Sequence, residues 1–389
     1  TTGRAKGVLT SNTNLGACTQ AGGPWGFDDS SVSLCAMPLF HIGGLGWALV
    51  GLANGAHNVV VADFTPESLL DTLVRERITN VFLVPTVIGM LVDVPGADQA
   101  DVGALRSIAY GSATITPALL RRTLRTFGTP LFQVYGLTET HGAVTQLDAA
   151  DHGTDPERAH LLRSVGRPYP WVELSIRTAS GTEASSGEQG EICVRTPQAT
   201  RGYHRRDAET AATIDADGWL STGDIATIDG DGNVTIVDRK KELMINESGK
   251  NMSPTNIENA MKAASSLIGQ VAAIGDGRPY VSALVVLDPD AAAARAKRLD
   301  LSGADLTELS SHPDVVDEVA VAIRAGNRSL SRVEQVKRFT IVPTAWDPGG
   351  DELTPTMKLR RKPIATKYAS EIGELYEAQP GRSVVDLRS

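Results

Sequence analysis

The strongest constraint on the fold is an alternation of short apolar runs with amphipathic segments up to about Leu147. The apolar runs predict buried strands at HNVVVADF (57–64), TNVFLVPT (79–86), LRSIAYGS (105–112) and PLFQVYG (130–136). Residues 66–77 and 117–128 show helical periodicity, and each begins with proline, which is favoured in the first turn of a helix. Such alternation predicts a parallel sheet with helices on its faces. Ligands of these sheets bind beyond the carboxyl ends of the strands.

The pattern changes after Val165. Apolar and polar residues alternate in segments 171–178, 190–196 and 232–239, and turn-rich stretches separate these segments. This pattern is typical of an antiparallel sheet or a small barrel.

Beyond Arg239 the sequence predicts a compact α+β unit. It contains a helix over 254–264 with Ser253 as its cap, a hairpin over 271–288 and a late strand over 336–343. We therefore predict an α/β protein with a domain over 1–238 and a C-terminal lid domain over 239–389. The first domain is expected to combine a parallel-sheet part (1–164) with a β-barrel-like antiparallel part (165–238).

Composition narrows the class of protein. A chain of 389 residues suits two or three domains, and 41% apolar with 21% charged residues is typical of a soluble globular protein. The net charge of −9 argues against nonspecific binding to nucleic acid. Three cysteines in apolar or strand-like contexts predict reduced, buried thiols in a cytosolic protein.

The stretch Ser30–Ala62 carries no Lys, Arg, Asp or Glu. A membrane-spanning helix needs roughly 20 mostly apolar residues. This stretch is interrupted by five glycines together with proline, histidine and asparagine, so we predict buried protein interior. The localisation expected is cytoplasmic, with at most peripheral association with the inner membrane surface.

The first seven residues, TTGRAKG, combine hydroxyls, glycine and one lysine. Backbone amides of such a loop can bind phosphate, and Lys6 would add positive charge. The segment does not match the GxxxxGK[ST] pattern, and a polar glycine-rich turn is the alternative.

Polar residues gather at two predicted strand ends. One end carries Gly111 and Ser112, and the next carries YGLTETHG at 135–142. Tyr135 could stack on a base, Thr138 could bind a phosphate oxygen, and Glu139 could bind Mg²⁺, which prefers oxygen ligands. The alternative is a polar strand-to-helix turn capped by Thr138 or Thr140.

The run from Ser221 to Glu258 adds further candidates. The carboxylate of Asp224 could accept hydrogen bonds from two ribose hydroxyls, or it could form an Asx turn. Arg239 ends a strand and could reach the same ribose or a phosphate. Alternatively, Arg239 could form an ion pair with Asp238 or Glu242.

The order of these motifs resembles the acyl-adenylate-forming (AMP-binding) superfamily. The matching segments are TTGRAKG, PLFHIGG, YGS, YGLTET, VGRP, DGWLSTGD, VDRKKELM, SGKNMSPTNIE and ELTPTMKLRR. They span the whole chain and form a highly specific set. SGKNMSPTNIEN, the hairpin GDGRPYVSALV and ELTPTMKLRR most resemble bacterial long-chain fatty-acid–CoA ligases.

The resemblance implies a role for each matching position. Thr1, Thr2, Gly3 and Lys6 belong to the phosphate loop, Gly111, Ser112, Tyr135 and Gly136 to the adenine side, and Thr138 and Glu139 to phosphate and Mg²⁺. Asp224 and Arg239 correspond to the ribose ligands, Lys241 to the hinge, Gly249 and Lys250 to the CoA face, and Lys358 to a mobile catalytic lysine. His41 lies near the entrance of the acyl pocket. From its spacing alone, Lys358 would be one member of a solvated basic run with Arg360, Arg361 and Lys362.

The reaction implied is ATP-dependent activation of a fatty acid to an acyl-adenylate, followed by thioester formation with CoA. ATP, Mg²⁺ and CoA are the expected cofactors and co-substrates. The alternatives are a sister ligase that passes the acyl group to a carrier protein, and a non-catalytic remnant that binds nucleotide or a partner.

The sequence departs from the family pattern in two places. It begins within the phosphate loop, so that roughly the first third of a typical member is absent, and Ala5 stands where the family usually has proline. We expect these 389 residues to adenylate poorly or not at all without preceding sequence. Robust fatty-acid-dependent ATP–pyrophosphate exchange by the 389 residues would contradict this expectation.

Overall fold

The computed structural model describes residues 6–113, 115–153, 156–301, 303–354, 357–381 and 383–388. The chain divides into two units, a large unit (Ala5–Ile236) and a small unit (Val237–Ser389). The division falls within strand β11 (Val234–Arg239), the strand in which the sequence predicts the domain boundary.

A seven-stranded sheet forms the centre of the large unit, in the order β2-β1-β3-β4-β5-β6-β7. The first five strands of this order are parallel to their neighbours, and β6 and β7 are added antiparallel. The strands are β1 (Val32–Cys35), β2 (His57–Val60), β3 (Asn80–Leu83), β4 (Ser107–Gly111), β5 (Leu131–Leu137), β6 (Gly142–Leu147) and β7 (Arg167–Pro168). The predicted parallel sheet is therefore confirmed, with an antiparallel extension at one edge.

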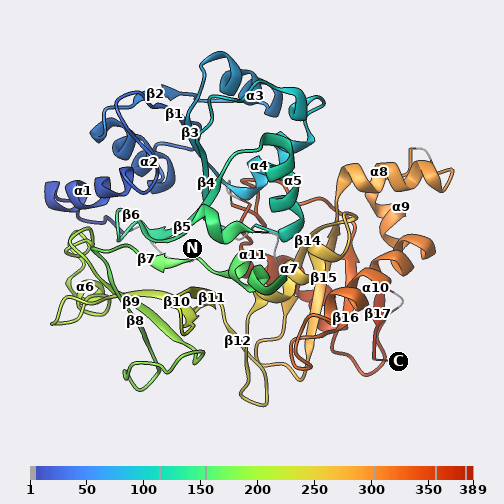
Figure 1. Cartoon of the computed structure of the whole chain (residues 1–389). Helices are drawn as coiled ribbons and strands as arrows, with labels where there is room; N and C mark the ends of the chain where they lie inside the picture. The colour runs from blue at the N-terminus through green and yellow to red at the C-terminus, as the bar shows by residue number, and fades with distance from the viewer. Residues whose placement is uncertain are drawn as a thin grey trace. The chain divides into compact units, whose positions relative to one another are not determined.

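Alternate residues of these strands face two different cores. Leu83 and Tyr110 pack with helices α3 (Pro66–Arg75), α4 (Pro85–Asp93) and α5 (Pro117–Phe127), whereas Phe82 and Ala109 pack on the opposite face against α2 (Ile42–Ala53). Figure 1 shows α3, α4 and α5 on one side of the strands and α2 on the other. Both faces of the inner strands β3 and β4 are thus buried, as the continuous apolar runs of the sequence require. The edge strand β2 is not buried, and its Val60 is 59% exposed, so the prediction of a buried strand over 57–64 is wrong in its burial.

Local signals in the sequence fix the ends of these helices. Thr65 and Thr116 cap α3 and α5 with their side-chain oxygens, and a proline follows each cap. Short helical segments complete this part of the unit: α1 (Asn12–Cys18), η1 (Thr19–Gly22), η2 (Ala97–Gln99), η3 (Ala149–His152) and η4 (Pro156–Arg163).

A second sheet of four antiparallel strands, in the order β11-β10-β9-β8, completes the large unit. Its remaining strands are β8 (Glu173–Arg177), β9 (Gly190–Arg195) and β10 (Leu220–Ile228), and the short helix α6 (Asp207–Ala211) precedes β10. The apolar side chains of this sheet, such as Ile192 and Leu220, share a core with α2.

The small unit is built on the four-stranded sheet β14-β15-β16-β17, with one parallel pair, β15 and β16. One face packs against α7 and α10, and the other against α11 and α12. The elements are β12 (Met244–Ile245), β13 (Asn251–Met252), α7 (Pro254–Ala264), β14 (Ile268–Ile274), β15 (Val281–Leu287), α8 (Pro289–Arg298), α9 (Leu306–Ser311), α10 (Pro313–Asn327), β16 (Val336–Val342), α11 (Arg361–Lys367), α12 (Ala369–Glu374) and β17 (Val384–Asp386). The predicted α+β unit is confirmed.

The uncharged stretch Ser30–Ala62 forms β1, α2 and β2 and lies within the large unit. Within the part of the chain that the structure describes, none of the helices combines the length and the apolar character needed to cross a bilayer. Cys18, Cys35 and Cys193 are free and buried, as predicted. Burial raises the pKa of the Cys18 thiol to about 11, which makes it a poor nucleophile at neutral pH.

Candidate active site

The turn after β5 carries the YGLTETHG segment. Its main anchor is the buried Thr140, whose hydroxyl donates to the carbonyl oxygen of Gly142 (2.7 Å) and also lies 3.1 Å from the carbonyl oxygen of Leu137. A strand, β6, follows this turn. The alternative of a helix cap is therefore wrong, because Thr140 closes a hairpin and leaves Thr138 exposed.

Gly136 allows β5 and β6 to approach closely at this turn. A Cβ atom at this position would lie 1.8 Å from the carbonyl oxygen of Gly142, and the ladder shifts register between Tyr135 and Gly136. Only glycine fits such an approach. The register shift changes which face of the sheet the following side chains occupy.

Tyr135 and Asp224 meet directly, although 89 positions separate them in the sequence. The Tyr135 hydroxyl donates to Oδ2 of Asp224 at 2.6 Å. Asp224 is 4% exposed and lies where the β9–β10 ladder shifts register, next to Gly223 with a φ of 76°. The irregularity in β10 thus directs this carboxylate towards the end of β5.

A second cluster joins Glu139, Tyr203 and Lys6. The Tyr203 hydroxyl donates to Oε1 of Glu139 at 2.7 Å, and the Lys6 ammonium lies 3.9 Å from the centroid of the Tyr203 ring. Burial, and secondarily the Glu139 carboxylate, raises the pKa of Tyr203 to about 12, so the phenol stays protonated and donates. A bridge between Val8 and Tyr203 holds the strand-like segment that carries Lys6.

Glu139 fits the type of site at which Mg²⁺ binds. Mg²⁺ usually takes one or two carboxylates and completes its shell with water and substrate phosphates. Tyr203 uses one oxygen of Glu139, while the second oxygen and the hydroxyl of the exposed Thr138 provide further oxygen donors. Within the described ranges no three His, Cys, Asp or Glu side chains are grouped to hold a metal ion, so substrate oxygens would have to complete the shell.

Gly111 and Ser112 stand at the carboxyl end of β4, next to β5. Ser112 adopts a φ of 65° and is exposed, as expected for a residue that turns the chain away from a strand end. Together with Gly136 it contributes to a cavity of about 80 Å³. The other lining residues are Cys18, Trp25, His41, Ile42, Gly43, Gly46, Trp47, Val50, Phe82, Val134, His141, Gly142 and Ala143.

Two histidines border this cavity. His41, expected near an acyl pocket, caps α2 by accepting a hydrogen bond from the Gly43 amide (3.1 Å). His141 is 3% exposed and contacts the Gln198 carbonyl through Nδ1 (2.7 Å) and the Thr10 hydroxyl through Nε2 (2.9 Å). A carbonyl only accepts, so Nδ1 carries a proton and donates to it.

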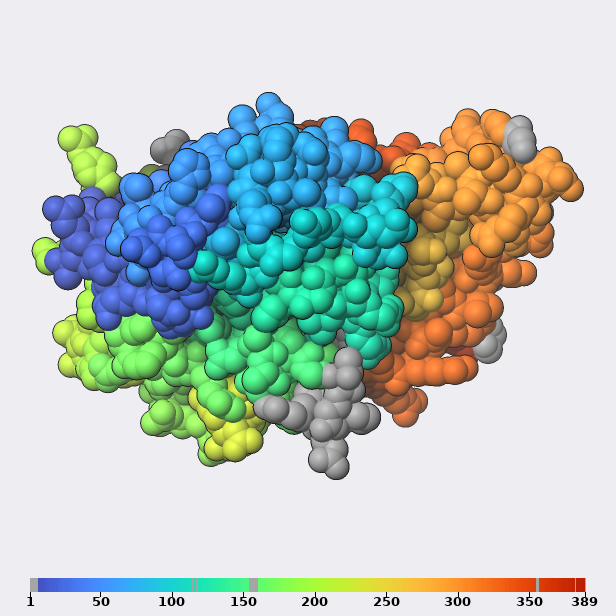
Figure 2. Space-filling model, turned by 45° about the horizontal axis from the view of Figure 1, so that its top comes forward, coloured from blue at the N-terminus to red at the C-terminus, as the bar shows by residue number. Residues whose placement is uncertain are grey.

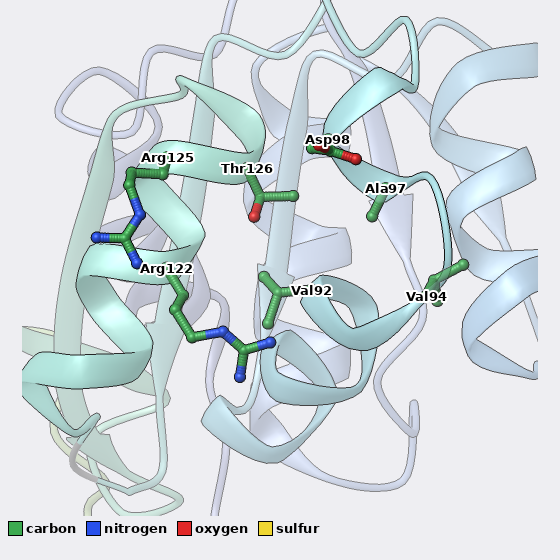
Figure 3. Close-up of a pocket in the computed structure, with 7 residues that line it drawn as sticks. All are labelled: Val92, Val94, Ala97, Asp98, Arg122, Arg125 and Thr126. Atoms are coloured by element: carbon green, nitrogen blue, oxygen red, sulfur yellow. The ribbon is translucent and has the colours of Figure 1, made fainter.

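A larger cavity of about 210 Å³ lies elsewhere in the large unit (Figure 3). Arg122, Arg125 and Thr126 of α5 line one side, opposite Ala97 and Asp98. Arg122 also forms an exposed ion pair with Asp93. None of the predicted site residues lines this cavity, so size alone does not identify the functional site.

In the small unit, a tight turn follows Arg239. The amides of Glu242 and Leu243 donate to the Arg239 carbonyl (2.9 and 3.1 Å), and the exposed Lys241 lies within this turn. Asp238, just before it, is buried and accepts from the Ser253 hydroxyl (2.5 Å) and the Thr255 amide (3.1 Å). The residue at the predicted hinge therefore adjoins a well-anchored strand end.

Gly249 and Lys250 form the turn of the hairpin β12–β13. Gly249 has a φ of 74°, and the Asn246 side chain accepts a hydrogen bond from the Lys250 amide at 2.9 Å. Both residues are exposed, as a surface that meets a ligand requires.

Lys358 is exposed and lies on a short loop closed on itself. Its amide donates to the Thr354 hydroxyl (3.0 Å), its carbonyl accepts from the Thr354 amide (2.8 Å), and a bridge pairs Leu353 with Leu359. Three positions later, Arg361 forms a two-point ion pair with Glu258 of α7 (2.6 and 2.9 Å). The Glu258 side chain is 6% exposed, so Arg361 is not part of a solvated basic run.

The structure thus brings some of the predicted residues into contact, whereas others belong to the small unit or lie outside the described residues. Tyr135 contacts Asp224, Glu139 is linked to Lys6 through Tyr203, and Ser112 shares a cavity with Gly136. The predictions at Thr1, Thr2 and Gly3 lie outside the described residues. Those at Arg239, Lys241, Gly249, Lys250 and Lys358 belong to the small unit.

Sequence reasoning missed Tyr203, His141 and the pairing of Glu258 with Arg361. Tyr203 offers one weak signal, an aromatic residue in the otherwise polar segment RGYHRR. The other partners are far apart in the sequence, and only the fold identifies them.

The large unit thus combines two sheets with candidate nucleotide-binding residues at strand ends, and a separate α+β unit follows it in the chain. The chain belongs to the AMP-binding enzyme family, whose model matches residues 1–204, and the model of the AMP-binding enzyme C-terminal domain matches residues 241–380.

Curated relatives include the putative fatty-acid–CoA ligase FadD11 of Mycobacterium tuberculosis, which is 40% identical over 338 residues, or 86% of this chain and 53% of that protein. The fatty acid–[acyl-carrier-protein] ligase ScoC of Streptomyces coeruleorubidus is 33% identical over 300 residues, or 74% of this chain and 56% of that protein. The chain therefore spans about half the length of these relatives.

Solved structures with the same fold include the amide bond synthetase McbA of Marinactinospora thermotolerans, with 29% identity and a TM-score of 0.74 over 93% of this chain and 68% of that one. The o-succinylbenzoate CoA synthetase of Bacillus subtilis, solved with ATP and magnesium, gives 25% identity and a TM-score of 0.72 over 93% of this chain and 67% of that one.

Proposed function

We propose that the protein activates a fatty acid with ATP and transfers the acyl group to CoA, releasing pyrophosphate and AMP. The observation that carries this proposal is the contact between Tyr135 and Asp224, because it joins two separate nucleotide-type motifs at one strand end. The relatives named as fatty-acid–CoA ligases support a fatty acid as the substrate and CoA as the acyl acceptor. We expect the reaction in the cytoplasm, with at most peripheral contact with a membrane.

In the first step a carboxylate oxygen attacks the α-phosphorus of ATP, and the bond from that phosphorus to the bridging oxygen breaks as pyrophosphate leaves. Asp224 and Arg239 would bind the ribose hydroxyls, and Tyr135 would stack on the adenine beside Gly111, Ser112 and Gly136. These contacts hold the α-phosphate at a fixed position relative to the acid.

Both reactants of this step are anions, so the site must supply positive charge. Lys6 and the remainder of the loop that contains Thr1, Thr2 and Gly3 would contact phosphate oxygens. Lys358 would stabilise the charge that develops in the transition state. Mg²⁺ bound at Glu139, with Thr138 nearby, would neutralise phosphate charge.

In the second step the CoA sulfur, having lost its proton, attacks the acyl carbon, and the bond to the AMP oxygen breaks. Lys358 is needed only for the first step. Rotation at Lys241 would withdraw it and present Gly249 and Lys250 to CoA.

The test is ATP–pyrophosphate exchange across a panel of fatty acids, with and without CoA. It is run on the 389 residues and on a longer form with preceding sequence. We expect exchange that depends on the acid in the longer form and thioester only when CoA is present. Absence of acid-dependent exchange in both forms would overturn the proposal.

Nucleotide binding provides a matched control for the role of Asp224. Asp224→Ala should weaken binding of AMP, while Asp231→Ala, in an exposed turn after the same strand, should not. Equal affinities of the two variants for AMP would show that Asp224 does not bind the nucleotide.

A second acceptor has specific support. ScoC, a relative, is named as a fatty acid–[acyl-carrier-protein] ligase. A phosphopantetheinyl carrier protein therefore belongs in the thioester assay beside CoA. Transfer to the carrier protein and not to CoA would identify the alternative reaction.

A further inference from the structure

The cavity of about 210 Å³ is separate from the candidate active site and has no role in the proposed function (Figure 3). Helix α5 forms one wall, and the chain from α4 to η2 forms the other. Both helices pack on the face of the central sheet opposite to α2. We call it the α5 cavity, lined by Arg122, Arg125 and Thr126 of α5 and by Val92, Val94 and Asp98 on the opposite wall.

Helix α5 is basic, although the net charge of the chain is −9. Its charged residues are Arg121, Arg122 and Arg125, and none of its residues is acidic. Arg125 lies four positions after Arg121 and three after Arg122, spacings at which like charges repel and destabilise a helix. The helix dipole favours Arg125 in the last turn, but not the two arginines one turn earlier. A bound anion would offset this repulsion.

The two arginines that line the cavity have N–H donors available for a ligand. Arg122 pairs with Asp93 through Nη2, which uses one of the five N–H donors of its guanidinium group. The two side chains of this pair are 46% and 65% exposed, so the pair contributes little stability and a ligand can compete for it. Arg125 is exposed and forms no ion pair with another residue that the structure describes. The half-buried Thr126 adds a hydroxyl group to the same wall.

The opposite wall has a different character. Val92 and Val94 provide apolar surface, and Asp98 provides an exposed carboxylate, which Figure 3 shows across the cavity from Arg122. An ionised carboxylate repels an anion and accepts hydrogen bonds without donating any. A ligand of this cavity therefore needs an anionic end at α5 and a hydrogen-bond donor, such as a hydroxyl group, at Asp98.

Phosphate fits the donors of α5. A phosphate monoester presents three strong acceptor oxygens, and the planar guanidinium group of arginine binds such oxygens through two parallel N–H groups. The volume limits the rest of the ligand. Pockets for drug-sized ligands measure about 300–1,000 Å³, whereas the α5 cavity measures about 210 Å³. It suits a phosphate group with a short carbon chain and is too small for a whole nucleotide.

We propose that the α5 cavity is a second binding site, which takes a small phosphate monoester that carries hydroxyl groups. Arg122 and Arg125 bind the phosphate, and Thr126 donates to one of its oxygens. Asp98 accepts a hydrogen bond from a ligand hydroxyl, and the carbon chain lies against Val92. The site is independent of the proposed ligase reaction, because none of the candidate nucleotide-binding or catalytic residues lines it.

Calorimetric titration of the purified protein with glycerol 3-phosphate, inorganic phosphate and glycerol tests the proposal. At an ionic strength of about 0.15 M, which screens distant charges, we expect saturable binding of both phosphate compounds. Glycerol 3-phosphate should bind about tenfold more tightly than phosphate, because its hydroxyl groups reach the charged Asp98. Glycerol lacks the anionic end and should show no saturable binding.

Substitutions on α5 assign this binding to the cavity. Arg122→Gln and Arg125→Gln should each weaken binding of glycerol 3-phosphate about tenfold, since each removes charge-assisted hydrogen bonds. Arg121→Gln is the matched control, because it removes the same charge from the same helix but lies outside the lining. It should weaken binding less than about threefold, since only a screened long-range attraction is lost. Asp93→Asn should strengthen binding, because it removes the carboxylate that competes for Arg122.

Asp98→Ala tests the orientation of the ligand. Without the repulsion from this carboxylate, inorganic phosphate should bind more tightly. Without the acceptor for its hydroxyl groups, glycerol 3-phosphate should lose its advantage over phosphate. An unchanged advantage in Asp98→Ala would contradict the role of Asp98.

The candidate phosphate loop is a second place at which phosphate compounds could bind, and Lys6→Ala separates the two sites. Binding that persists in Lys6→Ala and weakens in Arg122→Gln and Arg125→Gln would support the α5 cavity. Thermal unfolding establishes that each variant is folded. Arg125→Lys keeps the charge without the planar group and should fall between the unchanged protein and Arg125→Gln. Absence of saturable binding, loss in Lys6→Ala alone, or equal loss in Arg121→Gln and Arg125→Gln would overturn the proposal.

Discussion

The cluster at the end of β5 and the loop of Lys358 are organised in opposite ways. In the large unit the candidate functional groups touch one another, as Tyr135 and Asp224 do at 2.6 Å. In the small unit the candidate catalytic group, Lys358, is exposed, and the anchored group is its neighbour Arg361. Figure 2 shows part of the surface of each unit, coloured along the chain.

This difference matches what each region is proposed to do. Residues that bind a nucleotide through both steps benefit from contacts that fix them before binding. A lysine that acts in one step and withdraws before the next needs a firmly anchored loop and an exposed side chain. The ion pair of Arg361 with Glu258 supplies such an anchor, three positions after Lys358.

The largest effect should come from Lys358→Ala. Loss of a group that stabilises developing charge should lower the rate of pyrophosphate exchange about 100- to 1000-fold. The thioester step, started from synthetic acyl-AMP, should be largely retained. Lys362→Ala, an exposed residue of α11, is the control and should leave both rates unchanged. Equal loss of both steps in Lys358→Ala would contradict the proposed withdrawal of the lysine.

The second-largest effect is expected on stability, from a change in the ion pair that anchors the chain just after the Lys358 loop. Glu258→Gln removes the buried one of the two carboxylates that pair with Arg361, and breaking a buried pair in this way costs about 3–5 kcal/mol. Hydrogen exchange of amides in α7 and α11 should therefore accelerate. Glu242→Gln is the matched control, because Glu242 lies 3.6 Å from Arg361, is 42% exposed and should contribute less than about 1 kcal/mol.

The Glu258 and Glu242 variants also test whether the anchored ion pair positions the exposed Lys358. If Arg361 and Glu258 position Lys358, Glu258→Gln should slow pyrophosphate exchange more than it slows the thioester step. Unchanged exchange in a folded Glu258→Gln variant would make the ion pair purely structural.

A smaller effect is expected in the large unit from Tyr135→Phe. This change removes one hydrogen bond to Asp224, worth about 1 kcal/mol, and should weaken AMP binding about fivefold by calorimetry. Asp231→Asn, in an exposed turn, should bind AMP as the unchanged protein does. Tighter binding in Tyr135→Phe would mean that Tyr135 competes with the nucleotide for Asp224.

The smallest effect is a dependence of stability on pH at His152. Burial lowers the pKa of this imidazole below its ordinary value of 6.5, and its neutral form is bonded to the Asp148 carbonyl and the Tyr110 hydroxyl. The unfolded state therefore binds more protons near pH 6, so this stabilisation is present above pH 6.5 and is lost as pH falls towards the lower folded value.

Urea unfolding at several pH values checks this prediction. The slope cannot exceed about 1.4 kcal/mol per pH unit for one proton. His152→Gln should lose it, and an identical slope in that variant would assign the effect to other groups.

The sequence predicted most elements for local reasons. Helix α7 has the predicted bounds, since Ser253 caps it and Pro254 starts it. Strands β3 and β4 lie inside the predicted apolar runs, and β5 extends one residue beyond its run, to Leu137. Apart from the strand predicted over 57–64, the uncharged stretch Ser30–Ala62 was predicted only as buried interior, because a continuous apolar run suits a strand and a buried helix equally well.

The candidate site was predicted in part. Asp224, Tyr135 and Glu139 were identified from their motifs, whereas Tyr203, which connects Glu139 to Lys6, carries no motif. From the sequence, the turn after Glu139 had two interpretations, a ligand site or the cap of a helix. The fold excludes the helix, because Gly136 lets β6 pair closely with β5.

By itself the sequence determined the class of fold, the order of its elements and the residue types of a nucleotide site, because caps, periodicity and strand ends are local properties. Only the tertiary structure decided which of these residues meet. The pairs Tyr135–Asp224, Glu139–Tyr203 and Arg361–Glu258 join positions 89, 64 and 103 apart, and the lining of the cavity beside Ser112 and Gly136 comes from several elements. Such contacts depend on sheet order and register, which no local pattern encodes.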